Sequence, residues 1–186
     1  KKKEGKKITS QPIKGTIRRG ENQEEDQALK NELKSNPKER SENIMIVDLV
    51  RNDLSQIADF ESVKVEELCE IYSFESVHQM ISTISCELTE KVEFSDVLGA
   101  TFPMGSMTGA PKIRAMELIE REELTRRGLY SGSIGYIKPN GDFDFNVIIR
   151  SFLYNSSESY LSAMVGGAIT AKSNPEQEHE ETLVKI

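Results

Sequence analysis

The sequence predicts a mixed fold of helices and antiparallel strands, and two observations support this class. Polar segments whose apolar residues recur at helical spacing occur alongside segments rich in Val, Ile, Ser and Thr, which are typical of strands. In the second half of the chain, Asn140-Gly141 separates two such strand-like segments, and this dipeptide is a strong signal for a hairpin of antiparallel strands. At 186 residues the chain can bury one substantial core.

The first predicted elements are a strand and then helices. Residues 7–16 read as a strand that ends in a turn at Gly15. The polar segment 21–40 is expected to form a surface helix that is broken at Pro37. Residues 44–49 form an apolar run that periodicity alone assigns to neither class, and the charged residues before it favour a helix.

Two strands and two helices are predicted in the middle of the chain. Residues 62–68 and 72–88 read as strands around a turn. Ser95 is a suitable N-cap for a short helix that ends before Pro103. A further helix is expected over residues 111–124, because its first residue is a proline, which is favoured in a first turn.

The C-terminal part is predicted to form an antiparallel meander followed by a helix. The expected strands are residues 130–137, 143–153 and 160–169, with the Asn-Gly turn between the first two. A pair of glycines at 166–167 would let the backbone approach a neighbouring group closely. Pro175 is expected to begin a final acidic helix.

Composition and charge restrict the function classes. The chain is 37% hydrophobic and 30% charged with a net charge of −7, which suits a globular protein in water and argues against a protein that binds nucleic-acid phosphates. No apolar stretch approaches the ~20 residues that cross a bilayer, and the start lacks the apolar region of a signal peptide. We therefore expect a cytoplasmic protein whose cysteines, Cys69 and Cys86, are reduced and structural.

Both ends of the sequence have the character of cut ends. The chain begins without Met, directly in strand-like sequence, and it stops within a helical pattern. We expect residues 1–186 to be a piece of a longer protein.

Three charged residues share one face of the final predicted helix. Glu178 and Glu181 are three residues apart, and Lys185 follows Glu181 by four. This spacing is typical of an exposed, ion-paired face. The alternative is a hard-cation site, since Mg²⁺ prefers a few carboxylates together with water and ligand oxygens. Such a site would need a further acid from elsewhere in the fold.

Lys14 stands between Ile13 and Gly15, where the first strand meets its turn. A lysine there is either a surface charge or a side chain that projects into a cleft. To act as a nucleophile it would have to be neutral, although the ordinary pKa of lysine is about 10.4. Burial or nearby cations would have to lower that pKa.

Two further side chains have two interpretations each. His78, within an apolar strand rich in Ser and Thr, is either a hydrogen-bonded core residue or a catalyst. Arg150 is expected to point inward from an Ile-rich strand, where its guanidinium needs an anion. Either Asp144 or a bound carboxylate could supply that negative charge.

The loop before the helix over 111–124 is rich in small residues. Free backbone N–H groups and the helix dipole favour an anion at such an N-terminus. A carboxylate or phosphate site is therefore one interpretation, and a plain helix cap is the other. The small residues of the loop are Gly105, Ser106, Thr108 and Gly109.

Taken in order, several stretches of the chain resemble the chorismate-binding enzymes. The resemblance covers nearly the whole chain, and several long motifs in one order are far more specific than any single motif. They are PIKGT at 12–16, ENIMIVDLVRNDL at 42–54, VHQMIST at 77–83, PMGSMTGAPKIRAM at 103–116, YSGSIGYI at 130–137 and ExxET near the end.

The resemblance implies an α+β fold, an αββα sandwich of antiparallel sheets with flanking helices. It also implies that residues 1–186 form the C-terminal catalytic part of a single chorismate-binding domain, preceded by an N-terminal half. That half would supply a glutamate used as general acid and base, so this part alone is expected to be an incomplete catalyst.

Lys14 decides between the members of the family. Members that form aminodeoxychorismate resemble this chain in having lysine within PIKGT, where anthranilate synthases typically have alanine, and SVKVEEL at 62–68 resembles the same branch. The resemblance implies that Lys14 attacks C2 of chorismate and expels the C4 hydroxyl, after which ammonia adds at C4 and releases the lysine. The product would be 4-amino-4-deoxychorismate, a precursor of p-aminobenzoate and folate. The alternatives are amination at C2, as in anthranilate synthase, and a non-catalytic chorismate-binding fragment.

Further residues take roles by the same resemblance. His78 would lie near the departing C4 oxygen, as a second catalytic residue. A glutamine amidotransferase subunit would supply the ammonia. Mg²⁺ would be the metal, and its ligands would be Glu42, Glu178 and Glu181. The substrate contacts, with Tyr130 and Arg150 on the enolpyruvyl carboxylate, would be Gly15, Thr16, Thr108, Gly109, Tyr130, Arg150, Gly166 and Lys185.

Overall fold

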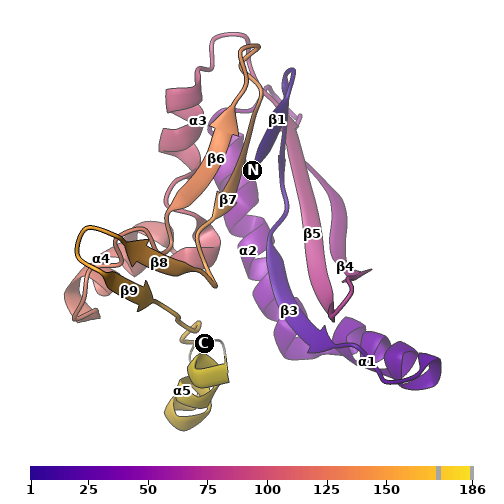
Figure 1. Cartoon of the computed structure of the whole chain (residues 1–186). Helices are drawn as coiled ribbons and strands as arrows, with labels where there is room; N and C mark the ends of the chain where they lie inside the picture. Colours follow the sequence, from indigo (N-terminus) through magenta and orange to yellow (C-terminus); the bar gives the residue numbers. More distant parts are fainter. Residues whose placement is uncertain (171–172, 185–186) are drawn as a thin grey trace. The chain divides into compact units, whose positions relative to one another are not determined.

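The computed structural model describes residues 1–170 and 173–184, except for the side chains of residues 181 and 184. The chain divides into two compact units. Unit 1 comprises Lys1–Glu122 and Gly135–Phe145, and unit 2 comprises Glu123–Ile134 and the described residues from Asn146 onward. Figure 1 traces the helices and strands of both units along the chain.

A seven-stranded sheet runs through unit 1. Its strands are β1 (Lys2–Glu4), β2 (Lys7–Ser10), β3 (Ile13–Arg18), β4 (Lys64–Ser73), β5 (Val77–Glu87), β6 (Ser133–Ile137) and β7 (Phe143–Val147). The central strand β5 has β4 along one edge, and along the other edge it pairs with β3 and then with β2. The sheet continues from β2 through β1 and β7 to β6. The pairings of β5 with β2, β3 and β4 are antiparallel, as are those of β1 with β2 and β7, which agrees with the predicted α+β class.

Two consecutive helices of unit 1 begin at asparagine caps. The side chains of Asn22 and Asn36 each accept hydrogen bonds from backbone N–H groups of the following first turn. Pro37 then occupies the first position of the second helix, where its missing N–H is tolerated. The predicted break at Pro37 is confirmed, and the apolar run 44–49 is helical, as its flanking charges indicated. The helices are α1 (Gln23–Ser35) and α2 (Pro37–Ser55).

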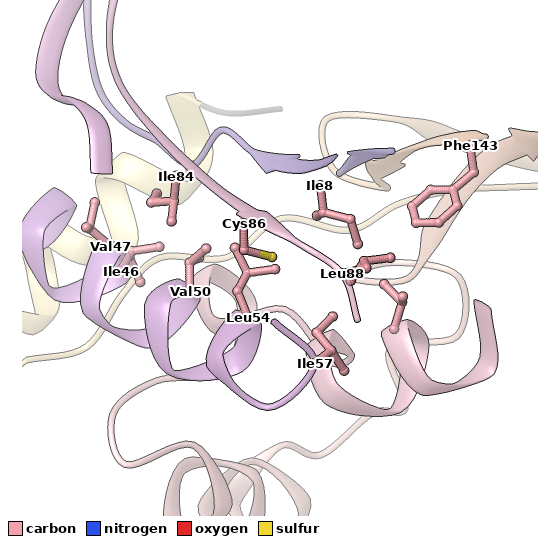
Figure 2. Close-up of a cluster of buried hydrophobic side chains, with 11 residues drawn as sticks. Ile8, Ile46, Val47, Val50, Leu54, Ile57, Ile84, Cys86, Leu88 and Phe143 are labelled. Carbon is pink, nitrogen blue, oxygen red and sulfur yellow. The ribbon is translucent and has the colours of Figure 1, made fainter. Parts of the chain in front are cut away.

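The core of unit 1 lies between α2 and the sheet (Figure 2). The buried apolar residues of α2 recur three or four positions apart, so one face of the helix packs on the strands. Burying each such side chain contributes about 1.5–3 kcal/mol. The cluster consists of Ile8, Ile46, Val47, Val50, Leu54, Ile57, Ile84, Cys86, Leu88, Val97 and Phe143.

The two long strands have boundaries that differ from the prediction. The break between them falls at residues 74–76 and not at 69–71, because β4 continues through Cys69. Cys69 is buried with a left-handed φ of 56°, at a shift of register between Glu67 and Glu70. A bulge of this kind absorbs a residue without ending the strand, and apolar patterning does not reveal it.

The next helices begin close to the predicted positions. Ser95 lies inside the first of them and is not its cap, because the backbone N–H of Glu93 instead donates to the Asp96 carboxylate at 2.8 Å. The second helix begins just after Pro111. These helices and the short turn between them are α3 (Phe94–Thr101), the 3₁₀ turn η1 (Gly105–Met107) and α4 (Lys112–Glu122).

Unit 2 holds a strand pair and the last helix. The predicted strand over 143–153 is interrupted between β7 and β8, and the one predicted over 160–169 is shorter than expected. Pro175 begins the final helix as predicted, after Asn174, whose side chain accepts a hydrogen bond from the first turn. The elements are β8 (Phe152–Asn155), β9 (Tyr160–Ala163), which pairs antiparallel with β8, and α5 (Pro175–Val184).

None of the helices in the described part of the chain has the length and apolar content needed to cross a bilayer.

Candidate active site

Lys14 and Glu42 lie together in unit 1. Nζ of Lys14, on β3, is 3.5 Å from Oε2 of Glu42, on α2, and the two side chains are 24% and 17% exposed. A partly buried ion pair of this kind is screened less than one in open solvent. The predicted nucleophile and one predicted metal ligand are therefore neighbours.

The strand β3 is irregular at Lys14. Ile13 and Thr16 are three residues apart, yet they pair with residues of β5 that are two apart, so β3 holds one extra residue between them. Gly15 has a φ of 93°, and a Cβ at this position would lie 3.1 Å from the Glu39 carboxylate. Both observations explain why glycine follows the lysine.

Thr16 and His78 belong to opposite faces of the sheet. Thr16 pairs with Gln79, whereas Ile17 pairs with His78. Directly paired residues share a face, and successive residues along a strand alternate between faces. Gln79 therefore lies on the same face of the sheet as Thr16, the predicted substrate contact, and His78 lies on the other face.

His78 is fully buried, and both of its ring nitrogens have partners. Nδ1 lies 2.9 Å from Oγ of Ser73, and Nε2 lies 3.0 Å from Oδ1 of Asp26. Since a carboxylate only accepts, Nε2 carries the hydrogen and Nδ1 accepts from the Ser73 hydroxyl. The Arg19 guanidinium, followed by the Gly20 backbone N–H, holds the pKa of the Asp26 carboxyl well below its usual range. This is the geometry of a hydrogen-bonded core histidine, and the catalytic role of His78 stays a prediction.

The loop with small residues is packed on α2. A Cβ at Gly105 would lie 3.0 Å from the Cβ of Leu49, a tighter contact than side chains normally make, so glycine favours this close approach. The Thr108 hydroxyl donates to the carbonyl of Met104 at 3.2 Å and thereby closes the loop on itself. The binding of an anion by Thr108 and Gly109 stays a prediction.

A buried ion pair joins the end of this loop to α2. Lys112, the first residue of α4, donates to both carboxylate oxygens of Asp53 at 2.6 and 2.7 Å. The side chain of Asp53 is only 2% exposed. Because an unpaired charge in such a place is costly, the pair holds the start of α4 against α2.

In unit 2, the paired glycines bring Tyr130 and Glu178 close to one stretch of backbone. A Cβ at Gly166 would lie 3.0 Å from the Tyr130 hydroxyl, and one at Gly167 would lie 3.2 Å from Oε2 of Glu178. Two predicted substrate contacts, Tyr130 and Gly166, are thus adjacent. The close backbone approach that the glycine pair predicted is confirmed.

Arg150 differs from its prediction. It lies in a bend between β7 and β8, is exposed, and has a left-handed φ of 51°. The prediction that it points inward from a strand is wrong, because the chain leaves the extended conformation after Val147. Its contact with a substrate carboxylate stays a prediction.

Two predicted site residues lie outside what the structure describes. They are Glu181, for its side chain, and Lys185 as a whole. The described carboxylates of the predicted metal site, Glu42 and Glu178, are hard oxygen donors of the type that Mg²⁺ prefers. Glu178 is buried in unit 2, and its binding of a cation stays a prediction.

The structure adds residues that the sequence analysis missed. Asn43 and Asp53 are buried on the face of α2 that also carries Ile46 and Val50. Polar residues at apolar positions of a helical pattern were the signal that could have revealed them. Nothing in the local sequence points to Asp26, whose partner His78 is 52 residues away.

The chain belongs to the family of chorismate binding enzymes, which matches it over residues 1–186. It is 47% identical to the chloroplastic aminodeoxychorismate synthase of Arabidopsis thaliana and 42% identical to aminodeoxychorismate synthase component 1 of Bacillus subtilis, over 96% and 98% of the chain. Anthranilate synthase component I from Streptococcus pneumoniae is similar in structure, with a TM-score of 0.85 and 35% identity over 99% of the chain. The chain spans 19%, 38% and 40% of these three proteins.

Proposed function

We propose that the protein containing this chain aminates chorismate at C4 and thereby forms 4-amino-4-deoxychorismate. The observation that carries the proposal is the lysine at position 14, held 3.5 Å from Glu42 on a bulge of β3. The likeness to relatives named aminodeoxychorismate synthase supports this choice over amination at C2.

Lys14 supplies a nucleophile that is returned at the end of the reaction. As the neutral amine, its Nζ forms a bond to C2 of chorismate while the C4 hydroxyl departs with its electron pair. The departing group takes the proton lost by the attacking nitrogen and leaves as water. Ammonia then bonds to C4, the bond between C2 and Nζ breaks, and a proton passes from the entering nitrogen to Lys14. Chorismate and ammonia thus become the amino product and water.

Carboxylates of the chain would hold the metal on which this proposal depends. Glu42 with Glu178 and Glu181 would bind Mg²⁺, which when bound offsets the charge of the substrate's ring carboxylate. Tyr130 and the backbone at Gly166 would orient the enolpyruvyl group.

Ammonia would come from a glutamine amidotransferase partner. Both cysteines of the chain, Cys69 and Cys86, are buried in the core, which does not suit a glutaminase nucleophile. The product is a precursor of p-aminobenzoate, so the proposed place of the protein is in folate synthesis.

Replacement of Lys14 tests the proposal. In the full-length protein with chorismate, ammonium salt and Mg²⁺, Lys14→Ala should lower amination by several orders of magnitude and leave chorismate binding largely intact. Lys7→Ala is the matched control, because Lys7 is an exposed lysine of the neighbouring strand, paired with Glu66. Full activity of Lys14→Ala would contradict the covalent step.

A further inference from the structure

A second polar residue of α2 contacts the segment that carries Lys14. Asn43 directly follows Glu42 and is 0% exposed. Its Nδ2 lies 3.5 Å from the carbonyl oxygen of Lys14 and 3.4 Å from that of Met80, at the long end of the hydrogen-bond range. The amide therefore bridges the bulge of β3 and the centre of β5.

The other side of the same amide is also occupied. Oδ1 of Asn43 accepts from the Ser82 hydroxyl at 2.5 Å and lies 3.7 Å from Sγ of Cys69. The Ser82 oxygen in turn accepts from the backbone N–H of Cys69 at 2.9 Å. One buried side chain thus connects α2 with β3, β4 and β5.

The bulge explains why β3 needs this partner. An extra residue removes the local backbone groups from the regular ladder, and a buried carbonyl left without a donor costs free energy. Asparagine offers two N–H donors and a carbonyl acceptor on one short side chain, which suits this position.

We propose that Asn43 is a positioning residue that sets Lys14 against Glu42, an inference that rests on the proposed function. Asn43 and Glu42 are consecutive on α2, so the hydrogen bond from Asn43 to the Lys14 carbonyl ties the lysine backbone to the helix turn that bears the carboxylate. The separation of Nζ and Oε2 depends on this tie. Misplacement of a reacting group by about 1 Å can cost on the order of 100-fold in rate.

Two substitutions among the hydrogen bonds of Asn43 distinguish the positioning of Lys14 from the stability of the fold. Asn43→Asp keeps the shape and the acceptor for Ser82, but it replaces the donors that face the carbonyls of Lys14 and Met80 with an oxygen. Ser82→Ala removes a hydrogen bond of the same buried amide and keeps both donors. Both variants should lower the melting temperature, so kcat is compared at a temperature at which both remain folded.

The first readout is steady-state amination by the full-length protein. Asn43→Asp should lower kcat about 100-fold with the KM for chorismate unchanged within about threefold, whereas Ser82→Ala should lower kcat by less than about threefold. Equal losses of kcat in the two variants would overturn the proposal. If Asn43→Asp does not fold, Asn43→Ser, which is too short to reach the Lys14 carbonyl, takes its place with the same expectation.

The second readout does not depend on turnover. After reductive methylation with ¹³C-formaldehyde, the NMR signal of Lys14, assigned with Lys14→Arg, should shift in Asn43→Asp and stay at the wild-type position in Ser82→Ala. An unmoved signal in Asn43→Asp would also overturn the proposal. If the wild-type protein does not aminate chorismate while the signal behaves as expected, the proposed function fails and the positioning of Lys14 by Asn43 is upheld.

Discussion

The two units differ in how the fold supports their predicted site residues. Among the described residues, the buried hydrophobic side chains all belong to unit 1, whereas aromatic side chains on β8 and β9 of unit 2 are exposed, Phe152 by 68%. Glu42 stands on α2, which packs on the core of unit 1, and Lys14 stands on β3, which pairs with β5 in the sheet. Tyr130 and Gly166 lie in turn and loop segments of unit 2. Packed elements suit a group that must be held rigidly, such as the proposed nucleophile, whereas loops suit groups that would only bind a substrate.

The largest expected difference between the units is in stability. Leu54→Ala, in the core of unit 1, should lower the free energy of unfolding by about 2–5 kcal/mol, because it leaves a cavity in a fully buried cluster. Leu161→Ala, at an exposed position of β9, should change it by less than about 0.5 kcal/mol. Urea unfolding measures both changes in the free energy of unfolding. Equal losses in the two variants would contradict the expected difference in stability between the units.

A second pair of substitutions compares two consecutive residues of β5 in unit 1, His78 and Gln79, which lie on opposite faces of the sheet. His78→Ala should lower the free energy of unfolding by about 1–3 kcal/mol, because it empties a fully buried position and breaks the hydrogen bonds of the imidazole ring to Ser73 and Asp26. Gln79→Ala should leave stability unchanged and lower chorismate turnover by about threefold to tenfold, because Gln79 shares a face with Thr16. Loss of turnover without loss of stability in His78→Ala would instead establish the catalytic role of His78.

The smallest expected effect is a pH dependence of stability that is stronger for a carboxylate of unit 1 than for one of unit 2. The pKa of Asp26 lies below its ordinary value of 3.8, mainly through Arg19, so the ionised carboxylate stabilises the folded state at neutral pH. This contribution is fully present above the unfolded pKa and is lost as pH falls from about 4 toward the folded pKa. The difference in unfolding free energy between wild type and Asp26→Asn should therefore be larger at pH 7 than at pH 2.

Glu123 provides the counterpart of Asp26 in unit 2. Its pKa is also lowered, by Arg127, but its side chain is more exposed, so solvent screens the pair. Glu123→Gln should show a weaker pH dependence in the same measurement. A stronger pH dependence for Glu123→Gln than for Asp26→Asn would contradict the expectation that the carboxylate of unit 1 contributes more to stability than that of unit 2.

Local chemistry made much of the fold predictable. Pro37 and Pro175 marked helix starts because proline fits only the first turn, and Asn140-Gly141 marked the turn between β6 and β7. The bulge at Cys69 and the bend at Arg150 were missed, because a left-handed φ at a non-glycine residue leaves no trace in an apolar pattern.

The candidate site was predictable only in part. The ordered motifs pointed to Lys14 and Glu42, which the fold brings together across 28 residues of sequence. The partners of His78 could not be predicted, because contacts between Asp26 and β5 depend on how α1 lies on the sheet. Asn43 escaped notice directly before the apolar run 44–49, although its buried amide lies within hydrogen-bond reach of the Lys14 carbonyl.

Identification of the product tests the central claim most directly. The full-length protein, supplied with chorismate, ammonium salt and Mg²⁺ and no lyase, should form 4-amino-4-deoxychorismate, with the new nitrogen on C4 in the NMR spectrum of the product. Formation of anthranilate, with the nitrogen on C2, would contradict the account.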